Sequence, residues 1–450
     1  MLLVRPILRG QLVTGCILRK GYMPGQLVSV TSTDRRQRFR TFMRRFNPTA
    51  SARLAITEGI IYESPARSLF KKLSTTADLA LGSQQLVVGG IGSGKTTELL
   101  LAEQVLARNE QMLPVYIDVS AETDLSDMSS GTLLASLGLH VWRSIKSKFE
   151  IPDSLSKVHE ELRNIAYGYE KHVWIPYEEP DEDPDYEPHE PDQEPGYFDI
   201  VAIKGKLKPP FPALKRDVVN LAKLVEQLTA FLKQQGIEIV VIFDGLDRLV
   251  KADQFWTVAE QDLRAMKRLE ISVLAAGPLS IMYGEGRQIK DYFDDVHYLP
   301  PVVADPKLST FLFEVLRLRR ADELMQPDQM QRLCLASGGV LRDLISLGRN
   351  AAENAYLDDS DSITASNMDR AIEQLGNSYL LGVGTRQNSI LQKMMQGEGF
   401  SPSGSDSMEL LITRRVLEQP GSRYEVHPAL ASVLSKTSKD SNGLQIDSDI

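Results

Sequence analysis

Residues 86–96 read Leu-Val-Val-Gly-Gly-Ile-Gly-Ser-Gly-Lys-Thr, and this stretch decides the fold. The apolar run from Gln84 to Val88 is too short for a helix and predicts a buried strand. Gly89–Thr96 then matches the pattern G-x-x-x-x-G-K-[ST], and the residues from Thr97 onward have helical apolar spacing. Strand, glycine loop and helix in this order are the setting in which that pattern binds phosphate.

The residue types of the loop suit a triphosphate with Mg²⁺. Its glycines leave room for backbone N–H groups to surround phosphate oxygens, and the following helix adds its own free N–H groups and positive dipole end. Lys95 is expected to reach the β- and γ-phosphates, and the Thr96 hydroxyl to bind Mg²⁺. The alternative is a glycine-rich turn that matches by chance. The expected nucleotide-binding residues are Gly89, Gly90, Ile91, Gly92, Ser93, Gly94, Lys95, Thr96 and Thr97.

An acid at the end of a second buried strand supplies the other half of the expected site. Ile237–Phe243 is continuously apolar, as in a parallel sheet covered on both faces, and Asp244 follows it. In phosphate-loop NTPases an acid there holds Mg²⁺, so Asp244 is the candidate metal ligand beside Thr96; a turn or N-cap aspartate is the alternative. Asp247 either polarises the attacking water or caps the next helix. Arg248 is either an inter-subunit finger or a partner in a surface ion pair.

A later arginine is the third candidate. Ser337-Gly-Gly-Val-Leu-Arg342 precedes and opens a predicted helix. An arginine there can reach back to the γ-phosphate and report whether it is present. The alternative is an exposed helix arginine.

The periodicity predicts a doubly wound α/β core followed by helices. Apolar strands alternate with helices up to about residue 305, after which the strand signal stops. The late order of helix, loop, helix, turn, strand and helix resembles a winged helix, with Val416 and Leu417 among the apolar positions of its second helix. The expected segments are a basic arm at 1–53, the core at 54–305, a helical lid at 306–384, a winged-helix-like domain at 385–436 and a disordered tail at 437–450.

Residues 176–196 differ in composition from the rest of the core. They contain ten acids, six prolines and no Lys or Arg. Such a stretch cannot bury a core and predicts an extended surface insertion. A basic partner for it is the less favoured alternative.

Charge is unevenly distributed along the 450 residues. Residues 1–53 carry eleven Arg or Lys and one acid, a net of +10, although the whole chain has a net charge of −9. This arm is open to three interpretations: a disordered arm or sequence upstream of a true start at Met23 or Met43, a transit segment, or a nucleic-acid or membrane contact. Two distant cysteines indicate a reducing compartment, and no apolar run is long enough to span a bilayer, so we expect a cytoplasmic protein without a membrane partner.

With these segments in place, the chain resembles the AAA+ and STAND branch of P-loop ATPases. The resemblance covers roughly residues 52–434 and includes a replication-initiator-like module of ATPase core, lid and winged helix. The Asp244-Gly-Leu-Asp-Arg248 run is closer to STAND-type ATPases, and Val426-His427-Pro428 is similar to a pattern in their winged helices. The resemblance implies ATP and Mg²⁺ as ligands and a sensor-2 role for Arg342.

Two positions depart from the AAA+ pattern. Gly245 stands where these enzymes usually have the glutamate that activates water, so hydrolysis is expected to be slow or to rely on Asp247. AAA+ enzymes carry a polar sensor-1 residue at the end of a strand, but the strand that ends near Ala276 has none. Only Ser280, a few residues later, could take that role.

The sequence therefore supports one leading hypothesis and two alternatives. The first is an ATP-driven conformational switch with slow hydrolysis, acting as a homo-oligomer or on an unidentified protein partner. The second is an initiator-like ATPase that binds DNA, although residues 385–450 carry seven bases and eight acids, which is not the basic patch of a DNA reader. The third is a nucleotide-binding regulator that never hydrolyses.

Overall fold

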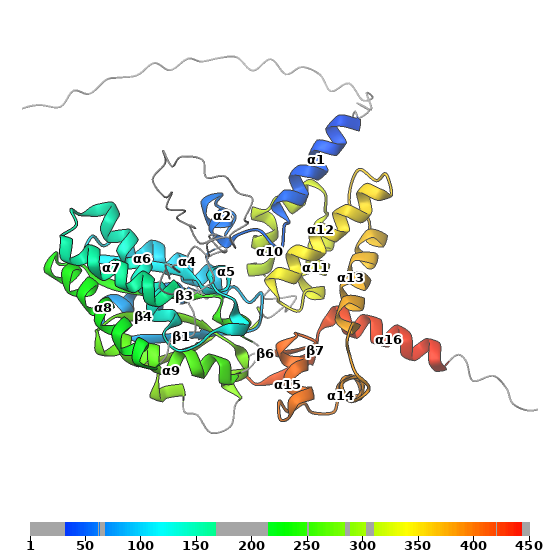
Figure 1. The fold of residues 1–450 in the computed structure, drawn as a ribbon. Helices are drawn as coiled ribbons and strands as arrows, with labels where there is room; N and C mark the ends of the chain where they lie inside the picture. The colour runs from blue at the N-terminus through cyan, green and yellow to red at the C-terminus, as the bar shows by residue number, and fades with distance from the viewer. Residues whose placement is uncertain are drawn as a thin grey trace, which may run out of the picture.

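The computed structural model describes residues 32–61, 63, 68–167, 215–249, 252–283, 289–302, 310–419 and 421–442 (Figure 1). The predicted acidic insertion at 176–196 lies outside these residues, as do residues 1–31 of the arm and 443–450 of the tail. None of the described helices is long and apolar enough to cross a membrane.

A parallel sheet of five described strands forms the centre of the core. The strands lie in the order β2-β3-β4-β1-β5. Because parallel strands end at the same edge, the loop after β1 and the acids that end β2 and β3 meet there, with Asp118 paired to Asp244 in register. The strands are β1 (Gln84–Val88), β2 (Met112–Asp118), β3 (Glu238–Asp244), β4 (Ser272–Gly277) and β5 (Asp295–Tyr298).

Helices cover both faces of this sheet, as the alternating sequence pattern predicted. Alternate side chains of β1–β4 belong to two different buried clusters, one shared with α3 and α4 and the other with α6–α9. The helices of the core are α2 (Ala52–Thr57), α3 (Leu69–Leu79), α4 (Lys95–Leu106), α5 (Val119–Glu122), α6 (Thr132–Lys148), α7 (Asp153–Tyr167), α8 (Lys215–Gln234) and α9 (Ala252–Arg268). The doubly wound α/β core is therefore confirmed.

A buried carboxylate on α9 holds the beginning of α6. Asp262 is fully buried and accepts hydrogen bonds from the backbone N–H groups of Gly131 (2.7 Å) and Leu133 (2.9 Å). These donors have no partner within their own helix, and the positive end of the helix dipole also favours a carboxylate there. Asp262 thus fastens two helices of the same face together.

We expect Asp262→Ala to lower the free energy of unfolding by about 2–4 kcal/mol, because it leaves buried N–H groups without an acceptor. Urea unfolding of the full chain measures this change. Asp253→Ala removes an exposed carboxylate from the same helix and should change stability by about 0.5 kcal/mol or less. Equal effects of the two substitutions would refute the capping role.

The lid follows the core as predicted. It consists of α10 (Thr310–Leu318), α11 (Pro327–Ala336), α12 (Leu341–Leu357) and α13 (Ala365–Leu380), which share a separate buried cluster. Figure 1 shows the lid beside the carboxyl edge of the sheet. The predicted fold class of an α/β core followed by a helical lid is therefore confirmed.

The prediction of an unstructured arm was wrong for its second half. Ser32–Arg45 forms α1, which packs along α12 of the lid (Figure 1). Phe39, Phe42 and Phe46 are 2%, 0% and 0% exposed. Their helical spacing was hidden among arginines, which lower the local hydropathy while leaving one face aromatic.

The C-terminal part contains α14 (Thr385–Met395), α15 (Ser405–Ile412), β6 (Val416–Gln419), β7 (Arg423–Val426) and α16 (Pro428–Asn442). Two predictions need correction here. Val416 and Leu417 belong to a strand that pairs antiparallel with β7, not to a helix. Residues 437–442 continue α16 and are not part of a separate tail. The order of helices and hairpin otherwise follows the predicted one.

Candidate functional site

The glycine loop turns tightly between β1 and α4 and meets the lid. Gly92 and Gly94 have positive φ angles of 82° and 103°, which side chains disfavour. A Cβ at Gly92 would lie 2.8 Å from the Cβ of Arg342, and one at Gly89 would lie 2.5 Å from the carbonyl oxygen of Leu299. Glycine at 92 therefore lets the lid helix approach the loop.

Lys95 lies at the centre of a buried charge cluster. Its side chain is 3% exposed, and its Nζ donates to the carbonyl oxygens of Gly89 (2.8 Å) and Gly90 (2.9 Å). The same Nζ forms an ion pair with Asp247 Oδ2 at 2.8 Å. The structure thus joins two residues that the sequence predicted for one site from positions about 150 apart.

Asp244 and Thr96 face each other across the loop. The Thr96 side chain lies close enough to the Asp244 carboxylate to lower the pKa of that carboxyl. Asp244 accepts from the hydroxyl of Tyr116 at 2.7 Å and from its neighbour Gly245 N–H at 2.8 Å. Burial raises the pKa of Asp244, and the charge of Asp247 adds to this effect. A hydroxyl beside a carboxylate is a hard oxygen donor set that fits Mg²⁺.

Tyr116 is a site residue that sequence reasoning missed. It lies on β2, and burial and the charge of Asp244 raise its pKa, so its hydroxyl is the donor. The sequence shows a tyrosine in a predicted strand, but it does not show that this strand pairs with the strand that ends in Asp244. The contact between Tyr116 and Asp244 therefore could not be predicted.

Gly245 occupies a place where a larger residue does not fit. Its φ is 85°, and a Cβ there would lie 2.8 Å from Ser120 Oγ and 2.9 Å from Asp118 Oδ1. Asp118 accepts a hydrogen bond from Ser120 at 2.7 Å. The end of β2 therefore fills the space next to the position that a glutamate takes in the AAA+ pattern.

A cavity of about 280 Å³ lies between the loop, the lid and the segment after α2. Asp244, Asp247, Arg248 and Arg342 line it, and Ser280 is not among the described lining residues. Of the predicted loop residues, Ile91, Gly92, Ser93, Gly94, Lys95, Thr96 and Thr97 line this cavity, whereas Gly89 and Gly90 do not.

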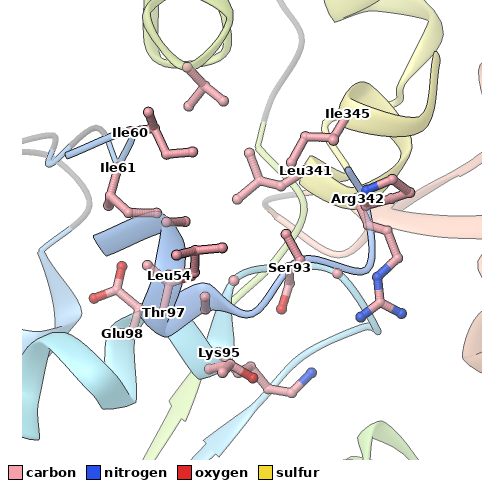
Figure 2. Close-up of a pocket in the computed structure, with 18 of the residues that line it drawn as sticks. Leu54, Ile60, Ile61, Ser93, Lys95, Thr97, Glu98, Leu341, Arg342 and Ile345 are labelled. Atoms are coloured by element: carbon pink, nitrogen blue, oxygen red, sulfur yellow. The ribbon is translucent and has the colours of Figure 1, made fainter. Parts of the chain in front are cut away.

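The cavity has a polar end and an apolar end. Figure 2 shows Lys95 at the loop and Arg342 reaching from the lid beside Ser93. On the other side it shows Ile60 and Ile61, facing the lid residues across the cavity. The arrangement can hold a ligand that is anionic at one end and apolar at the other.

Arg342 lies where the lid meets the loop. Desolvation lowers its pKa, and the positive charges of Arg414 and Arg248 add to this. Of these three arginines, Arg342 and Arg248 line the cavity, and two positive charges there favour an anionic ligand. The structure therefore places Arg342 beside the glycine loop, and its role toward a phosphate stays a prediction.

No protein-family model matches this chain, and a search of curated proteins finds no relative. Among solved structures, the Drosophila ORC bound to DNA is 12% identical, covering 97% of this chain and 90% of that chain with a TM-score of 0.41. The Aeropyrum pernix ORC2 protein in its ADP form is 14% identical, covering 90% and 98% with a TM-score of 0.41. Cdc6p from Pyrobaculum aerophilum is 13% identical, covering 88% and 98% with a TM-score of 0.38. These likenesses do not indicate what this chain binds.

Proposed function

We propose that this chain is an ATP-binding ATPase of the AAA+/STAND type that acts as a nucleotide-driven conformational switch. One observation carries the proposal: a single cavity is lined by the phosphate loop, by Asp244 at the end of β3 and by Arg342 of the lid. A triphosphate in this cavity would touch the core and the lid at once. Its presence or absence would then change how strongly the two are held together.

The chain's own groups would divide the work of binding. The loop N–H groups and Lys95 would hold the phosphates, and Lys95 would exchange Asp247 for phosphate oxygens. Thr96 and Asp244 would hold Mg²⁺, which when bound neutralises phosphate charge. Asp247, released from its ion pair with Lys95, would accept a proton from the attacking water.

Hydrolysis by this arrangement would be slow. Gly245 provides no carboxylate, and Asp247 must leave Lys95 before it can act as a base. A chain that binds ATP without turnover, the non-hydrolysing regulator, remains the nearest alternative. Arg248 lines the cavity and is exposed, which is compatible with a finger toward a neighbouring subunit in a homo-oligomer.

The lid would report on the γ-phosphate through Arg342. We expect Arg342→Ala to weaken ATP binding about 10- to 100-fold, because a charge-assisted hydrogen bond is lost, and to change ADP binding less than about threefold. Isothermal titration with both nucleotides measures this. Arg349→Ala, on the same helix outside the cavity, is the matched control. Equal losses for ATP and ADP would contradict γ-phosphate sensing.

A role as a DNA-binding initiator is the second alternative from the sequence. Its C-terminal domain would need a basic surface to contact phosphates, and the net charge of residues 385–450 is −1. This negative net charge favours a conformational switch that acts on a protein partner over an ATPase that binds DNA.

A further inference from the structure

One buried arginine of the cavity, Arg319, is not explained by phosphate binding. Arg319 follows α10, is 6% exposed and lines the cavity. Its Nη1 donates to the carbonyl oxygens of Ile60 at 3.0 Å and Val315 at 3.4 Å. No carboxylate among the described residues pairs with it, and burial lowers its pKa to about 10, so it stays charged at neutral pH.

The Nε of Arg319 is buried without any acceptor in the described part of the chain. A buried donor left without a partner is costly and therefore rare in native proteins. Nη2 makes no hydrogen bond to a described residue either, so Nη1 anchors the group while the side of the guanidinium that bears Nε stays free. This geometry points to a ligand that brings an acceptor into the cavity.

Arg319 lies at the apolar end of the cavity. The carbonyl of Ile60 holds its Nη1, and Figure 2 places Ile60 and Ile61 across the cavity from Arg342. Leu54 lines the same side, as do the charged residues Glu58 and Glu63, and Ile345 of the lid lies across the cavity. With the phosphates at the loop, the far end of a nucleotide lies here, and a planar base surrounded by aliphatic side chains satisfies both features.

We propose that Arg319 reads the base of the bound nucleotide by donating from Nε to a ring nitrogen of a purine. The inference rests on the proposed nucleotide binding and adds the residue that determines base preference. Each edge of adenine presents one ring nitrogen that can accept a hydrogen bond from such a donor. Guanine offers O6 and N7 together, which match two parallel donors of an arginine. The ligand class is therefore a purine nucleotide, and the two bases are distinguished by measurement.

The test compares binding of ATP, GTP and inorganic tripolyphosphate to the full chain. We expect Arg319→Met to weaken binding of the preferred purine nucleotide about tenfold or more and to leave tripolyphosphate binding unchanged within about twofold. Arg317→Met is the matched control, since Arg317 is exposed and its Nε contacts Glu314. Arg319→Lys keeps the charge and a donor for Ile60 but has no Nε–H, so it should fold normally and still lose base-dependent affinity.

Analogues of the preferred nucleotide identify the acceptor atom. In 1-deaza, 3-deaza and 7-deaza purine triphosphates one ring nitrogen is replaced by a carbon. One of them should bind wild type about tenfold more weakly and should show no further loss with Arg319→Met. The inference is overturned if wild type binds all three equally, or if Arg319→Met weakens tripolyphosphate as much as nucleotide. Nucleotide binding that is unchanged in Arg319→Met refutes this inference alone, whereas a wild type that binds no nucleotide refutes the proposed function as well.

Discussion

Lys95→Ala should abolish measurable ATP turnover and weaken ATP binding at least about 100-fold. The ammonium group is buried beside the loop carbonyls and is held by Asp247 at 2.8 Å. A charge in this position stabilises the phosphates in both the bound and the transition state, and removal of one such group typically lowers rates about 10²- to 10³-fold. Single-turnover hydrolysis and equilibrium titration of the full chain measure the two effects.

The control for Lys95→Ala must separate chemistry from folding. Lys72→Ala removes an exposed lysine from α3 and should leave both quantities unchanged within about twofold. Because Lys95→Ala also leaves Asp247 without its ion pair, urea unfolding of both variants should accompany the titrations. If a folded Lys95→Ala protein hydrolysed ATP at the wild-type rate, the glycine loop would not be the ATP-binding site.

Asp247→Asn extends the same experiment to the proton acceptor. The amide can still accept a hydrogen bond from Lys95, so ATP binding should stay within about threefold of wild type, whereas turnover should fall about 100-fold. Turnover that persists in this variant would exclude Asp247 as the base. ATP binding without turnover in wild type would instead establish the non-hydrolysing regulator.

The glycine loop after β1 and the position of Asp244 at the end of β3 were predictable because each is a local pattern. The spacing from Gly89 to Thr96 and the apolar run before Asp244 are contained in short windows, and parallel strands bring such ends together. The apolar spacing from Thr97 onward likewise predicted α4, and the end of the strand signal near residue 305 predicted the helical lid.

Features that depend on tertiary contacts were not predictable. The strand β5 is four residues long, and only its pairing with β1 makes it a strand. Val416 and Leu417 fit either a helix or a strand, and pairing with β7 decides between them. Tyr116 and Arg319 have no motif, because their roles come from the order of strands and from a cavity that no local window contains.

The largest effect on folding is expected at Asp343, next to Arg342 in the first turn of α12. Its carboxylate is 3% exposed and accepts from Tyr379 Oη at 2.5 Å and from Arg414 Nη1 at 2.9 Å. His427 Nε2 lies 3.2 Å away, and its Nδ1 accepts from a backbone N–H, so the proton on Nε2 faces Asp343. Tyr379 ends the lid, whereas Arg414 and His427 belong to the C-terminal part.

Asp343→Ala should lower the free energy of unfolding by about 3–5 kcal/mol, because the buried side chains of Arg414 and His427 then lose their carboxylate partner. Asp369→Ala is the matched control, since this exposed lid carboxylate pairs with Arg332 and its loss should change stability by about 1 kcal/mol or less. Urea unfolding measures both variants. Similar small changes would show that Asp343 does not hold the C-terminal part to the lid.

Acidification tests the same contact without a substitution. Burial by itself would raise the pKa of Asp343, but the neighbouring His427 ring and the charge of Arg414 outweigh it and hold the pKa below the ordinary value. A carboxyl with a lowered folded pKa contributes stability that is fully present above the unfolded pKa of about 4 and is lost as pH falls through the folded value. The stability difference between wild type and Asp343→Ala should therefore shrink below about pH 4.

Asp343 could also couple nucleotide binding to the C-terminal part. It follows Arg342 in α12, and its carboxylate contacts residues of the C-terminal part. If a γ-phosphate draws the first turn of α12 toward the loop through Arg342, the Asp343 carboxylate would move with that turn, and its contacts with Arg414 and His427 would change. We expect ATP to change hydrogen exchange in α15–α16 of wild type, and Asp343→Asn to abolish that change while ATP affinity stays within about threefold. An unchanged exchange response in Asp343→Asn would mean that the lid and the C-terminal part communicate through other contacts.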